Sequence, residues 1–401
     1  MKVNFYRKVL SNGMTVILEK RNLPIVSVAF AVRNGGINEK EEEKGISHFI
    51  EHMLYKGTPS RNAKRIGEEI EKNGGELNGF TSEEITAYWC KMPSKHLDIA
   101  LNVLSDMVQN PLFDEKELEK ERLVIFEEIK MYKDTPRLYV FDEVQKSMYG
   151  GTMSMNIIGT EKTMNSITRE KIVKKFQQVY SPNNLILCVV GEANFESLVK
   201  FAEKNFGKSK GRIPKMKFSL RNNSKTESRE GIDQANLAFA YHVPCSNNPQ
   251  SYAALILNFL MAVGLSSRLF AEIREKRNLA YAIKGESNIG KKFAHNTIYI
   301  GTKKENVGQV KELILREFEK VSKELGEAEL NQIKEQLIGN YHISMEDSQA
   351  QMVNLLASEV SGNAKDFYDF EKKILKVKLK EVKKLAAGVK KDYSFFALIP
   401  K

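Results

Sequence analysis

Cysteine and long apolar segments are both scarce in this 401-residue sequence. The three cysteines, Cys90, Cys188 and Cys245, are widely scattered, which excludes a disulfide framework and a thiolate zinc site and favours a reducing compartment. The longest apolar run, at residues 253–264, is interrupted by Asn258 and is far shorter than the roughly 20 residues that a membrane-spanning helix needs. The N-terminal residues lack the apolar core of a secretion signal. We therefore expect a cytoplasmic protein without a membrane partner.

The sequence also lacks a concentration of charge of one sign. Its 62 basic and 51 acidic side chains give a net charge of +11, but the two signs alternate closely, as at residues 114–117. A nucleic-acid-binding protein would need a clustered positive face with aromatic platforms, and the sequence shows neither. We expect no nucleic-acid partner. The 42% hydrophobic and 28% charged residues are typical of a folded globular protein, and the length predicts about two or three domains.

Strands and helices are interleaved along the first half of the chain. Alternating and β-branched segments predict strands at residues 16–18, 26–32, 86–92 and 185–191, and helical periodicity predicts helices at 64–73, 96–109 and 115–132. The third helix is opened by an Asp114 and Glu117 capping pattern. The predicted fold class is α+β.

A polar and basic stretch at residues 207–231 predicts a linker between two halves. The tripeptide Ala-Phe-Ala at residues 29–31 recurs at 238–240, an offset of 209 residues, which indicates a tandem duplication. We predict an N-terminal catalytic domain at 1–210 and a homologous C-terminal domain at 231–401.

One short segment carries the chemistry of a metal site. His48 and His52 are four residues apart, so on a helix both imidazoles project from the same face and can bind one cation. Glu51 stands beside them, close enough to reach a water without itself binding the metal, in the inverted H-x-x-E-H pattern. The neighbouring side chains are apolar, and their burial makes three polar residues costly unless they bind something. We predict a zinc site with Glu51 as the general base of amide hydrolysis.

A catalytic zinc needs a third protein ligand and an open fourth position. The helix predicted at 115–132 offers Glu121 and Glu128, which are seven residues apart and share a face. Glu127 is a rival ligand one position away, and spacing alone leaves the choice between Glu127 and Glu128 open.

The duplication predicts one zinc ion per chain. The offset of 209 residues places apolar side chains opposite the metal-binding residues of the first half, as expected where no ion is bound. The counterparts of His48, Glu51 and His52 are Leu257, Leu260 and Met261.

These segments resemble the pitrilysin-type zinc metallopeptidases, in particular their processing-peptidase-like subgroup. The resemblance covers nearly the whole chain and is carried by GISHFIEHMLYKGT at residues 45–58 and ERLVIFEEI at 121–129. Members of that family place the third ligand at about this distance and have a glutamate that assists catalysis seven residues before it. The resemblance implies Glu128 as the third ligand and Glu121 as the assisting residue.

The resemblance also implies substrate-binding residues. Residues 78–82 are similar to an edge strand that pairs with the substrate backbone, with Asn78, Phe80 and Thr81 as its binding residues. Arg274 and Tyr281, seven residues apart in the second half, are similar to a pair that holds the scissile carbonyl or its neighbours.

The sequence departs from the family pattern at two positions. Gly79 stands where alanine is usual, and Asn278 replaces a common glycine before Tyr281. Neither residue is a predicted ligand, so the departures bear on substrate preference.

By this resemblance, the chain has two tandem similar domains, each an antiparallel-rich sheet with helices packed on one face. Two chains form a homodimer around a chamber in which a zinc endopeptidase hydrolyses peptides or unfolded segments. The alternative is a non-catalytic clamshell subunit or peptide-binding scaffold of the same family. Such subunits usually lose a metal ligand, whereas His48, Glu51, His52 and Glu128 are all present here.

Overall fold

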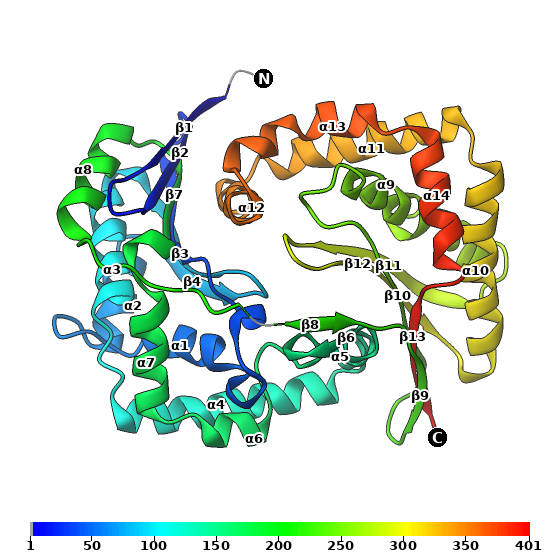
Figure 1. Ribbon diagram of the computed structural model, residues 1–401, viewed down its shortest axis with the longest axis horizontal. Helices are drawn as coiled ribbons and strands as arrows, with labels where there is room; N and C mark the ends of the chain where they lie inside the picture. Colours follow the sequence, from blue (N-terminus) through cyan, green and yellow to red (C-terminus); the bar gives the residue numbers. More distant parts are fainter. Residues whose placement is uncertain (1–2, 216) are drawn as a thin grey trace. The chain divides into compact units, whose positions relative to one another are not determined.

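A computed structural model describes residues 3–215 and 217–401, which form two compact units (Figure 1). Unit 1 comprises Met1–Lys130, Met155–Lys217 and Ser344–Phe367, and unit 2 comprises Met131–Ser154, Phe218–Ile343 and Tyr368–Lys401. Each unit therefore includes a segment from the other half of the sequence. The domain limits of 1–210 and 231–401, which refer to the sequence repeat, stay a prediction.

The centre of unit 1 is a six-stranded sheet with the order β1-β2-β7-β3-β5-β4. Its strands are β1 (Asn4–Val9), β2 (Thr15–Lys20), β3 (Ile25–Val32), β4 (Glu76–Thr81), β5 (Thr86–Pro93) and β7 (Leu185–Gly191). All neighbouring strands are antiparallel except β2 and β7, which are parallel. Nearly every residue of β3 and β7 is buried, as in a sheet that is covered on both faces.

The helices of unit 1 are α1 (Ile46–Leu54), α2 (Ala63–Glu71), α3 (Leu97–Gln109), most of α4 (Glu115–Asp134), α6 (Glu161–Ser166), α7 (Arg169–Val179), α8 (Phe195–Asn205) and α12 (Ser348–Ser361). Helices α3 and α12 both contact β3, and Figure 1 shows them on opposite sides of the sheet. On one face of β3, the Ser27 hydroxyl lies 2.9 Å from that of Ser348 in α12. The opposite face carries Phe30, which stacks on Phe206. A segment from the second half of the sequence thus completes the core of unit 1.

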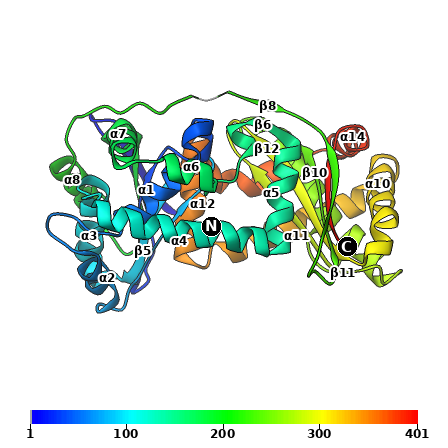
Figure 2. The ribbon, with the colours of Figure 1, turned by 90° about the horizontal axis from the view of Figure 1, so that it is seen from below.

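Unit 2 contains a five-stranded sheet with the order β11-β12-β10-β13-β9 and a two-stranded ribbon of β6 and β8. The strands are β6 (Tyr149–Gly151), β8 (Phe218–Leu220), β9 (Ser224–Arg229), β10 (Ala235–His242), β11 (Ala280–Ile289), β12 (Ala294–Thr302) and β13 (Ser394–Pro400). The helices are α5 (Pro136–Met148), α9 (Ser251–Ala262), α10 (Val307–Glu324), α11 (Glu327–Ser344), α13 (Phe370–Lys376) and α14 (Leu379–Val389). Helix α5 packs against β10 and β13 (Figure 2). Helix α9 packs against β11 and β12 (Figure 1).

The predicted α+β fold class is confirmed, with two units that each combine an antiparallel-rich sheet and packed helices. The linker predicted at 207–231 is partly wrong, because β8 and β9 lie within it and β9 pairs in parallel with β13. The polar side chains of β9 are compatible with an edge strand, which explains why the segment reads as a linker. No helix of the described residues has both the length and the apolar character needed to cross a bilayer.

Candidate metal centre

The start of α1 is fixed by a glycine and by a buried carboxylate. Gly45 has a φ of 94°, and a Cβ there would lie 2.6 Å from the Ile158 carbonyl oxygen, so no larger residue fits without a shift. The Glu39 carboxylate accepts hydrogen bonds from the backbone N–H groups of Gly45 (3.0 Å) and Ser47 (2.7 Å). Because the first N–H groups of a helix have no partner within the helix, Glu39 satisfies donors that burial would otherwise leave unpaired.

The two histidines of α1 meet a carboxylate of α4. The His48 and His52 rings have centroids 4.6 Å apart, as expected for one helical turn. Glu128 Oε2 lies 3.4 Å from His48 Nε2 and 3.6 Å from His52 Nε2. Among residues 3–215 and 217–401, these three form the group whose ligand atoms converge closely enough for a metal ion, all within 4.8 Å of one another. The structure therefore brings together the three predicted ligands.

The donor atoms fit a zinc ion. Tetrahedral zinc with bonds of about 2.0–2.2 Å holds pairs of ligand atoms about 3.3–3.6 Å apart, close to the spacings between Glu128 Oε2 and the two Nε2 atoms. Glu128 Oε2 is buried and has no hydrogen-bond partner of normal geometry in the described part of the chain. A buried carboxylate oxygen without a donor is costly, and a cation bound by two imidazoles would remove that cost. Two imidazoles and one carboxylate are a common ligand set of catalytic zinc.

Glu127, the rival ligand, is placed elsewhere. Its side chain is 73% exposed and pairs with Lys130 at 2.7 Å. One residue along α4 turns the side chain by about 100°, which is enough to take Glu127 out of the site.

The two histidines have opposite pKa shifts. Burial, together with the neighbouring His52, lowers the pKa of His48 to about 4, so this imidazole is neutral and ready to bind a cation. Burial also acts to lower the pKa of His52, but its hydrogen bond with Glu121 and its ion pair with Glu128 outweigh burial and raise it to about 9. A cation that binds His52 Nε2 must therefore displace a proton.

Glu121 contacts His52 on the side away from Glu128. His52 Nδ1 lies 3.0 Å from Glu121 Oε2, and Lys56 Nζ lies 2.6 Å from Glu121 Oε1. Burial acts to raise the pKa of Glu121, but the hydrogen bonds from His52 and Lys56 prevail and lower it, so the carboxyl is ionised. An acceptor at Nδ1 fixes the tautomer that leaves Nε2 free for a metal.

Glu51 projects from α1 towards strand β4. The Thr81 hydroxyl donates a hydrogen bond of 2.6 Å to Glu51 Oε2. Burial raises the pKa of Glu51 above its usual value, although the bond from Thr81 opposes that shift. A carboxylate whose pKa is raised is a stronger proton acceptor, which is the property that a general base needs.

The predicted edge strand is β4, and among the described residues it pairs on one side only, with β5. In this register Asn78 is opposite Trp89 and Phe80 is opposite Ala87. Its other edge can accept an extended peptide, so β4 can act as predicted. Substrate binding by Asn78, Phe80 and Thr81 itself stays a prediction.

Arg274 and Tyr281 lie in unit 2. Arg274 is in a π-helical segment, Phe270–Glu275, with its guanidinium 4.7 Å from the centroid of the Phe270 ring. Tyr281 lies at a register shift in β11 and is 68% exposed. Asn278 has a φ of 53°, a conformation that glycine and asparagine adopt most readily, which explains how asparagine replaces glycine there. The role of the pair in substrate binding stays a prediction.

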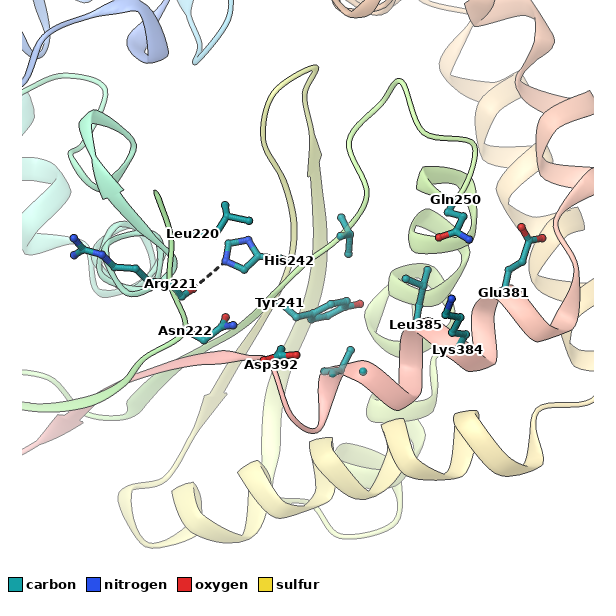
Figure 3. A pocket seen from close by; sticks show the side chains of 13 residues that line it. Leu220, Arg221, Asn222, Tyr241, His242, Gln250, Glu381, Lys384, Leu385 and Asp392 are labelled. Atoms are coloured by element: carbon teal, nitrogen blue, oxygen red, sulfur yellow. Dashed lines mark hydrogen bonds between the residues drawn. The ribbon is translucent and has the colours of Figure 1, made fainter. Parts of the chain in front are cut away.

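Unit 2 also contains a cavity of about 480 Å³, which Figure 3 shows from close by. His242 and Tyr241 line it from the end of β10, and Glu381, Lys384 and Leu385 line it from α14. His242 Nε2 lies 2.9 Å from the Arg221 carbonyl oxygen and therefore donates to it. None of the predicted site residues lines this cavity.

Sequence reasoning missed three residues that surround the site. They are Glu39, which caps α1, Lys56, which contacts Glu121, and Tyr55, whose hydroxyl is buried beside Gly79. Tyr55 and Lys56 follow the metal motif by three and four residues, so helical spacing from His52 could have drawn attention to them. Glu39 gives no such signal, because it precedes the helix.

Comparisons with known proteins agree along nearly the whole chain. Residues 15–161 match the family described as insulinase (peptidase family M16), and residues 166–337 match the peptidase M16 inactive domain. The zinc protease YmxG of Bacillus subtilis is 32% identical over 402 residues, which cover 98% of this chain and 98% of that protein. A zinc protease of Rickettsia felis is 32% identical over 352 residues, which cover 86% of this chain and 85% of that protein.

Two solved structures have the same fold. A protease from Helicobacter pylori superposes with a TM-score of 0.93 at 22% identity, covering 99% of this chain and 100% of that one. A peptidase M16 inactive domain from Pseudomonas fluorescens superposes with a TM-score of 0.89 at 18% identity, covering 99% of this chain and 98% of that one.

Proposed function

Because this chain belongs to the insulinase family of peptidases, family M16, we propose that it is a zinc-dependent endopeptidase acting on peptides or unfolded segments. The observation that carries the proposal is the convergence of His48, His52 and Glu128, with Glu51 on the same helix. The relatives YmxG and its Rickettsia counterpart are named zinc proteases, which supports zinc as the ion.

In the proposed mechanism, the residues of unit 1 hold the ion and move the proton. His48, His52 and Glu128 would bind zinc, which, when bound, polarises a carbonyl and lowers the pKa of water. Glu51 takes the proton of the attacking water and then donates it to the leaving nitrogen. Glu121 holds His52 in the tautomer that binds through Nε2. Strand β4 offers backbone groups to an extended substrate.

We infer one zinc ion per chain, and this number is supported by the second half of the sequence. Its counterparts of the metal-binding residues lie on α9 and are buried apolar side chains, Leu257, Leu260 and Met261. These offer no donor to a cation.

We also propose that the chain acts in the cytoplasm as a homodimer that encloses its substrates. The three free cysteines support a reducing compartment. The family resemblance supports the dimer and its chamber, in which Arg274 and Tyr281 would hold the substrate. Light scattering at micromolar concentration should give twice the monomer mass. A mass equal to that of the monomer would contradict the proposed dimer and its chamber.

The second candidate function is a non-catalytic subunit of the same family. The match of residues 166–337 to an inactive domain favours it only for that part of the chain, which contains none of the four predicted metal-site residues. A scaffold would not need Glu51, because its predicted role is to transfer a proton rather than to bind the metal.

The two functions are separated by replacing Glu51→Gln. The variant should retain zinc and lose peptide cleavage by at least about a thousandfold, because the amide cannot accept the proton. Glu42→Gln, at an exposed residue of the 3-10 turn Glu41–Glu43, is the matched control and should cleave at the wild-type rate. Retained cleavage by Glu51→Gln would exclude Glu51 as the base.

A further inference from the structure

The hydroxyl group of Tyr55 is buried at the end of α1 and makes no hydrogen bond to any described residue. A buried hydroxyl without a hydrogen-bond partner is unfavourable, so we expect a group near Tyr55 that can accept a hydrogen bond from it. Burial raises the pKa of Tyr55 well above its usual value, so the group keeps its proton and remains a donor.

The space that this hydroxyl occupies exists because residue 79 is glycine. A Cβ on Gly79 would lie 2.4 Å from the Tyr55 hydroxyl oxygen, 2.9 Å from the Ala87 carbonyl oxygen and 3.4 Å from Glu51 Oε1. The Tyr55 hydroxyl and Glu51 Oε1 therefore both lie next to the space that a methyl group on residue 79 would fill.

Strand β4 presents a second donor to the same carboxylate. Thr81 is two residues after Gly79, so both face the same side of the strand. The Thr81 hydroxyl donates to Glu51 Oε2, the other oxygen of the carboxylate. Glu51 thus has one oxygen held by Thr81 and the other directed towards the space beside Tyr55.

Neither Tyr88 nor Tyr180 accepts a hydrogen bond from the Tyr55 hydroxyl. The Tyr55 ring lies 6.1 Å from that of Tyr88, but the Tyr88 hydroxyl pairs with that of Tyr180 at 2.7 Å. The Tyr55 hydroxyl is therefore without a partner in the described part of the chain, and both it and Glu51 Oε1 lie close to the Cβ position of residue 79.

We propose that Tyr55 is a positioning residue for the general base: its hydroxyl, admitted by the missing Cβ of Gly79, donates to Glu51 Oε1 during turnover while Thr81 holds Oε2. With both oxygens held, the carboxylate keeps one orientation towards the attacking water, which lowers the entropy cost of proton transfer. This inference rests on the proposed peptidase function and adds a residue to it.

Four variants test the proposal on an internally quenched peptide that the wild type cleaves. Tyr55→Phe should lower kcat about tenfold, as expected for loss of one hydrogen bond to a charged group, with KM and zinc content unchanged. Tyr180→Phe removes a buried hydroxyl that pairs with Tyr88, and its kcat should stay within about twofold of the wild type. Gly79→Ala should lower both kcat and the melting temperature, because its methyl group would meet the Tyr55 hydroxyl and the Ala87 carbonyl oxygen.

The double variant Tyr55→Phe/Gly79→Ala should melt at a higher temperature than Gly79→Ala, because the closer of the two short contacts, that with the Tyr55 hydroxyl, is removed while that with the Ala87 carbonyl oxygen remains. A wild-type kcat for Tyr55→Phe would overturn the positioning role, and a double variant no more stable than Gly79→Ala would overturn the steric pairing. If the wild type cleaved no peptide at all, the proposed function would fail and the role of Tyr55 with it. The melting temperatures would still decide whether Tyr55 and Gly79 are matched.

Discussion

His52 Nδ1 lies 3.0 Å from Glu121 Oε2, and this contact ties a helix near the start of the chain to one that begins 61 residues after it ends, from Leu54 to Glu115. Glu121 is in turn held by Lys56 at 2.6 Å. The arrangement is that of a histidine ligand whose second nitrogen is bound by a carboxylate, which orients the ring and raises its basicity.

Glu121→Gln should weaken zinc binding about 10- to 100-fold, because an amide oxygen holds the His52 N–H less strongly than a carboxylate does. The measurement is a competition titration against a chelator of known affinity. Glu117→Gln, one turn earlier on α4 in a surface pair with Lys120, is the control and should bind zinc as the wild type does. Equal affinities for the two variants would show that Glu121 has no part in holding the ligand.

Zinc binding should release a proton and strengthen as the pH rises. His52 has a pKa of about 9 without the ion, so at pH 7 it is protonated and must lose that proton, whereas His48, with a pKa of about 4, is already neutral. The apparent affinity should therefore rise about tenfold per pH unit below pH 9 and level off above it. Calorimetry at pH 7 in buffers of different ionisation enthalpy measures the release. A result near zero protons would contradict these pKa shifts.

The raised pKa of His52 also predicts how the stability of the zinc-free protein depends on pH. The pKa of His52 is raised above its unfolded value of 6.5, so its ion pairs stabilise the fold fully below that pH, and this contribution is lost as the pH rises through about 9. In chelator, the melting temperature of the wild type should fall between pH 6.5 and 9 by more than that of His52→Gln. Parallel curves for the two proteins would contradict the prediction.

Replacing Glu39→Ala should destabilise the protein by about 1–3 kcal/mol, because two buried N–H groups at the start of α1 lose their acceptor. Thermal unfolding measures the loss, and zinc content should fall with it, since α1 carries the two proposed ligands His48 and His52. The control is Glu41→Ala, at a residue of the neighbouring turn that is not buried. An unchanged melting temperature for Glu39→Ala would show that the cap is dispensable.

The sequence predicted the local part of this site and not its long-range part. His48, Glu51 and His52 follow from helical spacing within one turn, and the Asp114 capping pattern is confirmed by the hydrogen bonds that Asp114 accepts at the start of α4. Spacing left Glu127 and Glu128 equivalent, because the choice depends on which face of α4 meets α1. That contact joins distant segments, which periodicity does not report.

The packing of distant segments within each unit could not be predicted from the sequence either, because periodicity reports only local structure. Helix α12 completes the core of unit 1 from more than 300 residues beyond β3, as the contact between Ser27 and Ser348 illustrates. Strand β9 has the polar side chains that are typical of a linker, although its backbone pairs with β13. Pairing of this kind depends on main-chain groups, which every sequence has.

The most direct test of the account is the zinc content of two variants that differ by one position on α4. Purified wild type and Glu127→Gln should each contain about one zinc ion per chain, whereas Glu128→Gln should bind it far more weakly and lose it on dialysis, because a neutral amide replaces the third ligand. If Glu128→Gln retained one zinc ion per chain, or if the wild type bound none when supplied with zinc, the proposed metal centre would be contradicted.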